Sequence, residues 1–314
     1  RQLSQFLDQT VDDPSQIKSA HIGELTSLGL QSLKNTIYTA NKQFTEIDKE
    51  LVNFEERHAF ITRKHKKIST SFFRFLQKKK IGKLEEEIKG IEININEIKE
   101  QLELSKVDLA ISHDETFAEL FNNLNQSYFR LMSTHKIWDI THRKDIDRIK
   151  MRSVAENEIR RTDVRASVER CTLINSKTTP LKLSNVNGGD LFFYPGFLLV
   201  YNSEHSFAII DYSELEVDGY QYNIVENESV PKDSEIISYT WYKCNKDGTP
   251  DKRFKDNFQI PILKYNAISF KSRSGLNELF LFSNSGNADF FKSLLKEYCS
   301  AISIANSMLN EFKQ

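Results

Sequence analysis

The sequence predicts an α+β protein in which a long helical part precedes a β-rich part. Three observations support this fold class. No proline occurs between Ser15 and Thr179, as long continuous helices require. Within that region, apolar residues recur at steps of three and four over two long stretches. From Pro180 onward, where five of the six prolines lie, short segments rich in β-branched and aromatic residues replace the helical spacing.

These observations place a domain boundary near residues 172–182. Residues 1–172 are predicted to form a helical coiled-coil bundle, and residues 183–314 a β domain that ends in a helix. A chain of 314 residues is long enough for two domains that each bury a core of their own.

Two helices with continuous heptad seams are predicted to form an antiparallel hairpin. The first seam consists of Leu30, Leu33, Ile37, Ala40, Phe44, Ile47, Leu51, Phe54, His58 and Ile61. The second consists of Leu84, Ile88, Ile91, Ile95, Ile98, Leu102 and Leu109. At the usual helical rise, the two seams correspond to rods about 40–48 Å long.

A third helix is expected to run back beside the first two and complete a three-helix antiparallel bundle. Its apolar positions are Phe117, Leu120, Leu124 and Leu131, followed by Trp138, Ile146, Ile149, Val154, Val164 and Val168. This course would bring the basic segment ITHRKDIDRIK, residues 140–150, to the level of the hairpin turn.

The turn between the two seams is the strongest functional signal in the chain. Residues 63–83 read RKHKKISTSFFRFLQKKKIGK and contain nine Lys or Arg residues and no acid, although the whole chain has a net charge of −1. Such a segment attracts polyanions. The candidate membrane- or anion-binding residues are Arg63, Lys64, Lys66, Lys67, Phe72, Phe73, Arg74, Phe75, Lys78, Lys79 and Lys80. The alternatives are that the cations form only a solvated helix end and that the aromatic residues tuck under the bundle as a lid.

The β part is predicted to contain about seven short strands followed by one helix. The strand segments are LFFYPGFLLVY, SFAIIDYSELEV, YQYNIV, EIISYTWYKC, FQIPILKY, NAISFKS and ELFLFS. The helix lies in NADFFKSLLKEYCSAISIANSMLNEF, with Phe290, Leu294, Tyr298, Ile302 and Leu309 on one face.

Seven antiparallel strands capped by a C-terminal helix resemble a pleckstrin-homology or GRAM-like domain, and residues 189–217 resemble the opening of such domains. The resemblance implies a β-barrel that binds proteins or lipid headgroups. The phosphoinositide-binding lysines of those families flank the first two strands, where this chain offers only Lys177 and Lys182. The resemblance therefore favours a protein contact over inositol-phosphate recognition.

A second candidate site lies in the loop at residues 245–257, NKDGTPDKRFKDN. Lys252, Arg253, Phe254 and Lys255 are possible partner-binding residues, because an arginine can clamp a carboxylate or phosphate with two hydrogen bonds. The alternative is structural, with the aspartates of the loop fixing its turn.

The inventory of motifs argues against an enzyme. The sequence contains no Gly-rich phosphate loop, no HExxH motif and no nucleophile elbow. Cys171, Cys244 and Cys299 are far apart and lack metal-site spacing, so neither a disulfide framework nor a metal site is predicted. We expect no catalytic residues, no metal and no cofactor, and a reducing, cytoplasmic location with peripheral membrane contact.

Two functional hypotheses follow. The first is a non-enzymatic adaptor that docks on an anionic surface, most readily a membrane, through the basic and aromatic hairpin tip, with the PH-like domain contacting protein or lipid. The second is a scaffold subunit of a multiprotein assembly, with a protein partner or nucleic acid bound at the tip. A homo-oligomer is expected in either case, and if the bundle dimerises, two tips on one particle add avidity.

Overall fold

The computed structural model describes residues 16–105, 115–145, 157–176, 178–227, 229–245 and 247–311. Their contacts divide the chain into two compact units. The hairpin unit comprises residues 32–109 and 170–178, and the β unit comprises residues 1–31, 110–169 and 179–314.

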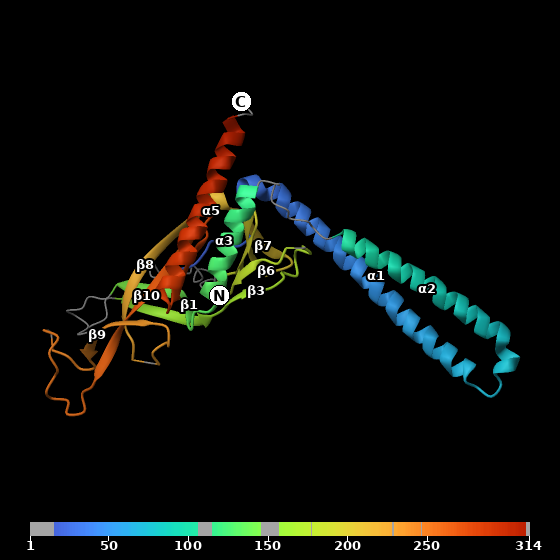
Figure 1. Ribbon diagram of the computed structural model, residues 1–314, viewed down its shortest axis with the longest axis horizontal. Coiled ribbons are helices and arrows are strands. Elements are labelled where there is room, and N and C mark those ends of the chain that lie inside the picture. Colours follow the sequence, from blue (N-terminus) through green and yellow to red (C-terminus); the bar gives the residue numbers. More distant parts are fainter. Residues whose placement is uncertain are drawn as a thin grey trace, which may run out of the picture. The chain divides into compact units, whose positions relative to one another are not determined.

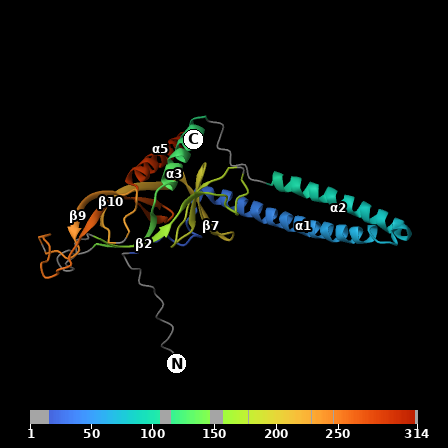
Figure 2. The ribbon, with the colours of Figure 1, turned by 60° about the horizontal axis from the view of Figure 1, so that its bottom comes forward.

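The hairpin unit contains the predicted pair of long helices. A 3-10 turn, η1 (Leu28–Leu30), leads into α1 (Gln31–Ser69), and a second one, η2 (Arg74–Gln77), leads into α2 (Lys78–Leu104). Both views show α1 and α2 side by side (Figure 1; Figure 2). At the usual rise α1 is about 58 Å long and α2 about 40 Å. The predicted helical hairpin is therefore confirmed, with a first rod longer than its seam suggested.

The heptad seam holds the hairpin together. Ile61, Leu84, Ile91 and Ile95 form a buried cluster, against which Leu51, Phe54, Ile68 and Ile88 pack. The ion pairs Arg57–Glu87 (2.7 Å) and Lys99–Glu55 (2.9 Å) join the two helices at its exposed border. Exposed pairs of this kind contribute little to stability, so the apolar seam supplies most of it.

Residues 170–178 belong to the same compact unit as the hairpin. Cys171, Leu173 and Ile174 in this segment are buried, as is Ile37 in the first half of α1.

The β unit contains two antiparallel sheets. One has the order β2-β1-β11-β10-β8, with β9 also paired to β10. Its strands are β1 (Ile137–Asp145), β2 (Asn157–Val164), β8 (Leu215–Val225), β9 (Glu235–Trp241), β10 (Gln259–Ser272) and β11 (Asn277–Phe282).

The second sheet has the order β3-β4-β5-β6-β7. Its strands are β3 (Ala166–Val168), β4 (Leu181–Leu183), β5 (Asp190–Tyr194), β6 (Phe197–Ser203) and β7 (Ser206–Asp211). A 3-10 turn, η3 (Tyr212–Glu214), connects β7 to β8. The predicted Tyr-Pro-Gly turn joins β5 to β6, and Gly196 adopts φ 93° there, a left-handed conformation that favours glycine.

Two helices, α3 (Glu115–Met132) and α5 (Ser285–Glu311), lie side by side in the β unit (Figure 1; Figure 2). Their buried residues share one core with the two sheets. The helical members of this core are Phe121, Leu124, Tyr128, Leu131, Ala288, Phe291, Leu295, Tyr298 and Cys299. Three residues of the predicted face of α5 are confirmed, because Tyr298 is fully buried in this core and Leu294 and Ile302 pack against it. Phe290 is 38% exposed and lies under the Arg130 guanidinium, 4.9 Å from the ring centre, while Leu309 is outside the residues whose side chains are described.

The predicted course of the third helix is wrong. α3 packs in the β-unit core, and the chain turns into strand after Met132. Trp138 and Ile140 lie on one face of β1 and are buried in a second cluster with Tyr265, because their spacing is that of a strand rather than a helix. Val164 and Val168 end β2 and β3, and Ile146, Ile149 and Val154 lie outside the described residues.

The described part of the basic segment 140–150 is therefore not carried on a third helix of the bundle. Its residues up to Asp145 belong to β1, which pairs with β2 and β11 in the β unit, and residues 146–150 lie outside the described part of the chain.

The predicted seven-stranded barrel also needs correction. In the described part of the chain the two sheets share no ladder, and they do not close into a barrel. The sheets also contain more strands than predicted, because β1 and β2 extend the first sheet beyond β11 and β3 extends the second beyond β4.

A strap formed by residues 16–27 runs over the β unit. Its backbone bonds include Ile17 N to Thr141 O (3.1 Å), Ala20 N to Gly275 O (2.9 Å) and Ser27 N to Ile209 O (2.9 Å). The last of these bonds covers the free edge of β7. The strap thereby fixes the start of the chain's described part onto both sheets.

Candidate functional site: the tip of the hairpin

The turn between α1 and α2 is closed by its own backbone. Thr70 N donates to Lys66 O (3.1 Å), Arg74 N to Ser71 O (3.1 Å) and Leu76 N to Phe73 O (3.1 Å). The Thr70 hydroxyl also donates to Lys66 O (2.8 Å). Because these bonds involve only the main chain and one small side chain, the aromatic residues of the turn are not needed to close it.

The apolar side chains of the turn are exposed. Phe72 is 87% exposed, Phe73 57%, Phe75 61% and Leu76 71%. Phe72 and Phe73 touch edge to face with ring centres 5.4 Å apart. The alternative that these residues tuck under the bundle as a lid is therefore wrong, and they form an exposed apolar patch of the kind that marks contact surfaces.

The cations of the turn are exposed as well. All nine Lys and Arg side chains between residues 63 and 83 are exposed, and none of them forms an ion pair with a described residue: Arg63, Lys64, Lys66, Lys67, Arg74, Lys78, Lys79, Lys80 and Lys83. Among the described acids nearest in sequence, Glu85 is bonded to His65 within the tip segment (3.2 Å) and Glu87 to Arg57 (2.7 Å), while the exposed Glu86 forms no ion pair with the nine cations. The positive charge of the tip is thus left for an external anion.

The start of α2 strengthens this field. Lys78, Lys79 and Lys80 occupy its first turn, which contains no acid, and Gln77 at the N-cap makes no side-chain capping bond. The N-terminal end of a helix carries partial positive charge and unpaired N–H groups, so acids stabilise it and lysines destabilise it. Three lysines here add positive charge to an end that is already positive.

The second predicted cluster, at residues 252–255, lies in the β unit and is separate in structure from the tip cluster. Arg253 donates from Nε to Asp251 Oδ1 (2.9 Å) and from Nη2 to Asp251 Oδ2 (2.6 Å). These bonds lower the pKa of Asp251 to about 2. Asp247 Oδ1 accepts from the backbone N–H (3.1 Å) and the hydroxyl (2.6 Å) of Thr249. The aspartates therefore fix the turn, as the structural alternative proposes.

Sequence reasoning missed an aromatic surface beside this cluster. The rings of Tyr242 and Phe258 stack with centres 5.0 Å apart, and Lys243 lies 4.5 Å from the ring centre of Tyr242 and 5.9 Å from that of Phe254. These rings are 47–54% exposed. The signal in the sequence was the density of aromatic residues on both sides of the loop, which we interpreted only as strand-forming.

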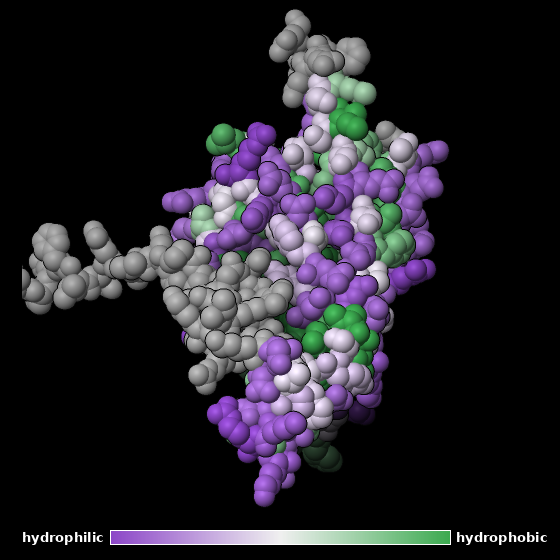
Figure 3. Space-filling model, turned by 90° about the vertical axis from the view of Figure 1, so that its left-hand side faces the viewer, coloured by the Kyte–Doolittle hydropathy of each residue, from purple (hydrophilic) through white to green (hydrophobic). Residues whose placement is uncertain are grey.

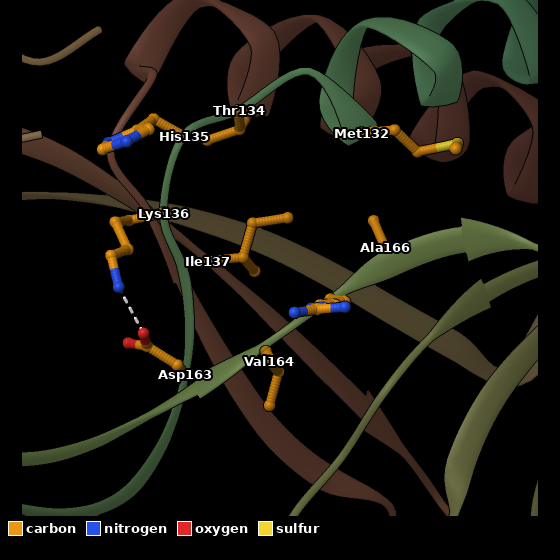
Figure 4. A pocket seen from close by; sticks show the side chains of 9 residues that line it. Met132, Thr134, His135, Lys136, Ile137, Asp163, Val164 and Ala166 are labelled. Atoms are coloured by element: carbon orange, nitrogen blue, oxygen red, sulfur yellow. Dashed lines mark hydrogen bonds and ion pairs between the residues drawn. The ribbon is translucent and has the colours of Figure 1, made fainter. Parts of the chain in front are cut away.

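A polar cleft of about 480 Å³ lies between the end of α3, the start of β1 and the β2–β3 segment (Figure 4). Met132, Ile137, Val164 and Ala166 line it together with Thr134, His135, Lys136, Asp163 and Arg165. Figure 4 shows Lys136 and Asp163 pointing toward one another, and the two form an ion pair. His135 also has partners, because its backbone N–H donates to Asp233 Oδ2 (2.8 Å) and its ring Nδ1 accepts from Lys232 N (3.3 Å). The cleft is open, and its charged groups are largely satisfied within the chain.

Among the described residues, no group of three or more His, Cys, Asp or Glu side chains is arranged to hold a metal ion. No described helix combines the length and the apolar character needed to cross a bilayer. Comparison with protein-family models, curated proteins and solved structures returned no match.

Proposed function

We propose that this protein is a non-enzymatic adaptor that docks on an anionic membrane surface through the tip of its helical hairpin. One observation carries the proposal. A single turn exposes four apolar side chains among nine cations that have no ion-pair partner in the described part of the chain. This combination is the composition of interfacial anchors, in which apolar groups enter the headgroup region while lysines and arginines meet phosphates.

The two kinds of side chain have complementary roles. A Lys or Arg near an anionic leaflet contributes about 1 kcal/mol, and only some of the nine can reach the surface at once. Phe72, Phe73 and Phe75 supply the apolar part, and their mean exposure of about two-thirds leaves most of each ring to be transferred from water. Phe72, Phe73 and Phe75 would insert, while Arg74, Lys78, Lys79 and Lys80 would meet phosphate.

The β unit is proposed to be a PH-like module. Strands β4 to β7 form a consecutive meander, β8, β10 and β11 form a second one, and α5 follows directly. We propose that this arrangement corresponds to that of a pleckstrin-homology domain, with β1, β2, β3, β9 and α3 as additions and without a closed barrel. Lys182 is paired with both Glu169 and Asp190 (3.0 Å to the latter), and Lys177 lies outside the described residues. The module is therefore proposed to contact a protein rather than an inositol phosphate.

A scaffold that binds nucleic acid at the tip is the second candidate. The exposed rings of Phe72, Phe73 and Phe75 beside cations favour it, since bases stack on aromatic side chains in single-strand binding. The near-neutral net charge of −1 limits any nucleic-acid binding to the local basic surface of the tip.

Co-sedimentation with vesicles containing phosphatidylserine, beside vesicles of phosphatidylcholine alone and a gel-shift assay with single-stranded DNA, separates the two candidates. The wild-type protein is expected to sediment only with the anionic vesicles, and less as salt is raised, because exposed charges are screened. A variant with Phe72, Phe73 and Phe75 changed to Ser is expected to lose most of this binding. Phe60→Ser provides the matched control, since Phe60 is 66% exposed on α1 but lies outside the tip.

Each outcome has one meaning. Loss of sedimentation in the triple variant with normal behaviour of Phe60→Ser supports membrane docking. A DNA shift that depends on the same phenylalanines, without vesicle binding, replaces it by the nucleic-acid candidate. A wild-type protein that binds neither contradicts both and leaves the tip as a protein contact or a solvated cap.

A further inference from the structure

Five described strands have only one neighbour and therefore present a free edge: β2, β3, β7, β8 and β9. A free edge exposes unpaired backbone groups that can pair with another chain, and proteins usually protect such edges with charge, shortness or a cover. Comparing the five edges shows which of them lacks that protection.

Four edges are protected. β2 carries Arg160, Arg161 and Asp163, and β3 is only three residues long. β7 is covered by the strap, through Ser27 N to Ile209 O (2.9 Å) and Ile209 N to Thr26 Oγ1 (3.3 Å). β8 carries Glu216 and Asp218 near its start, and Lys296 of α5 binds Asp218 (3.1 Å).

The fifth edge, that of β9, has little such protection. Residues 236–241 read IISYTW, without charge, proline or glycine. Ile236 is 45% exposed, Ile237 41% and Tyr239 58%. Figure 3 looks onto the side of the β unit that carries β9, and hydrophobic patches interrupt the hydrophilic surface of this face, one of them in its lower half. Among the described residues, 236–241 make backbone bonds only to β10.

The hydrogen bonds beside β9 show which of its backbone groups point outward. Tyr242 N donates across to Phe258 O (2.9 Å), so Tyr242 faces β10. Pro261, opposite Tyr239, turns its carbonyl to the other side, where it accepts from Glu226 N (3.0 Å). Hydrogen-bonded and non-hydrogen-bonded pairs alternate along an antiparallel ladder, and Tyr242 is in a hydrogen-bonded pair. The position of Trp241 is therefore non-hydrogen-bonded toward β10, as is that of Tyr239, so the N–H and C=O groups of Tyr239 and Trp241 point to the free edge.

We infer that this edge pairs with the same edge of a second copy of the chain. The argument for a second copy is that the edge is complementary to itself. Its centre is uncharged, while its only acid, Glu235, which also pairs with Lys264 of the same chain (3.2 Å), lies at one end and Lys243 lies just beyond the other. Two copies related by a two-fold axis would run antiparallel, which brings the Glu235 end of one strand beside the Lys243 end of its partner.

The ladder also defines the register. The register of the β9–β10 ladder shifts between Ile262 and Leu263, which leaves Ile237 as an extra, bulged residue of β9. Regular pairing of the free edge with a second copy is therefore limited to the residues after Ile237. The two outward-facing residues there are Tyr239 and Trp241. If the two-fold axis passes beside Thr240, Tyr239 of each copy lies opposite Trp241 of the other, and aromatic residues that face each other across a ladder stabilise it.

A cysteine at the axis tests this register. Thr240 would face its own copy in a non-hydrogen-bonded pair, with Cα atoms about 4.5 Å apart, a separation that a disulfide can span. Thr240→Cys, in a background in which the half-exposed Cys244 is changed to Ser, is expected to form a disulfide-linked dimer under mild oxidation. Tyr220→Cys in the same background is the control, because Tyr220 is 43% exposed on β8, a different edge, and is expected to form no disulfide-linked dimer.

Sedimentation of unmodified chains provides a second measurement that does not depend on a cysteine. The wild type is expected to dimerise, and Tyr239→Lys to be monomeric at the same concentration. Glu235→Lys and Lys243→Glu are each expected to weaken the dimer, and the double exchange to restore it in part. A monomeric wild type, a dimer unaffected by Tyr239→Lys, or equal cross-linking at residues 220 and 240 would each overturn the inference. None of these results depends on whether the hairpin tip binds a membrane.

Discussion

The buried carboxyl group of Glu278 is expected to make the stability of the β unit depend on pH near neutrality. Glu278 is 1% exposed in β11, and its Oε1 accepts from the Ser19 hydroxyl (2.5 Å) while its Oε2 meets no hydrogen-bond partner in the described part of the chain. Burial, and secondarily the nearby Asp139 carboxylate, raise the pKa of Glu278 from 4.5 to about 7. Burial also raises the pKa of Asp139.

The sign and size of the effect follow from proton linkage. Below about pH 4.5 Glu278 is protonated in both the folded and the unfolded chain, so it causes no difference. As the pH rises toward 7, the unfolded chain releases this proton first, and the free energy of unfolding falls. A shift from 4.5 to about 7 corresponds to about 3 kcal/mol that is lost above pH 7. Glu278→Gln, which can still accept from Ser19, is expected to remove this fall.

Urea unfolding between about pH 5 and pH 8 measures the effect. The wild type is expected to lose about 2.5 kcal/mol more than Glu278→Gln over this range, because part of the effect already occurs below pH 5. Glu216→Gln, an exposed position on β8, is the matched control and should follow the wild type. If the wild type and Glu278→Gln keep a constant difference at every pH, Glu278 titrates normally and the argument from its burial is wrong.

Three further predictions concern the hairpin, the strap and the tip. Ile91→Asp places a charge in the seam, where Ile91 is 4% exposed, and should cost the hairpin about 3 kcal/mol or more, seen as lost helical circular dichroism with the near-ultraviolet signal of the β unit retained. Gly275→Ala should destabilise the strap by about 1–3 kcal/mol, because φ is 103° and an added Cβ would lie 2.7 Å from Ala20 Cβ. Gly248→Ala is the control, because Gly248 also has a positive φ (82°) but nothing lies near an added Cβ. Thermal unfolding of this variant should show only the cost of the backbone strain, without that of a steric clash. Lys79→Glu with Lys80→Glu should increase the free energy of unfolding of the hairpin by about 0.3–1 kcal/mol for each residue, and so raise its melting temperature. The same variant should no longer sediment with anionic vesicles. A lowered melting temperature would contradict the dipole argument.

The hairpin was predictable because its determinants are local. The seam residues from Leu30 to Ile61 are all buried or half-buried in α1, as the heptad spacing required. The exposure of Phe72 and its neighbours followed from their position at the turn. The length of α1 was less predictable, since residues 170–178, far along the chain, belong to the same compact unit as the hairpin.

The β unit was predictable only in part, because its pairings are non-local. β1 contains only two strand-like alternating pairs before a polar run, and its partner β11 lies about 140 residues later, so no local pattern distinguished it from a continuing helix. FQIPILKY and NAISFKS were predicted as two strands but form the single strand β10. Pro261 did not interrupt it, because Pro261 lies opposite Tyr239, where the ladder requires no N–H from it.

The tip combines features that oppose the stability of the hairpin. A sequence that served stability alone would place acids in the first turn of α2 and a capping side chain at position 77, yet it has three lysines and Gln77 without a capping bond. It would also pair some of the nine cations with the glutamates of α2, but Glu85 is bonded to His65, which lies between the cations of the tip segment, and Glu87 is bonded to Arg57 of α1. The described acids at the start of α2 therefore form no ion pair with the tip cations. An anionic surface would relieve the repulsion among the lysines, occupy the free N–H groups of α2 and cover the phenylalanines at the same time, so one partner accounts for all three unfavourable features.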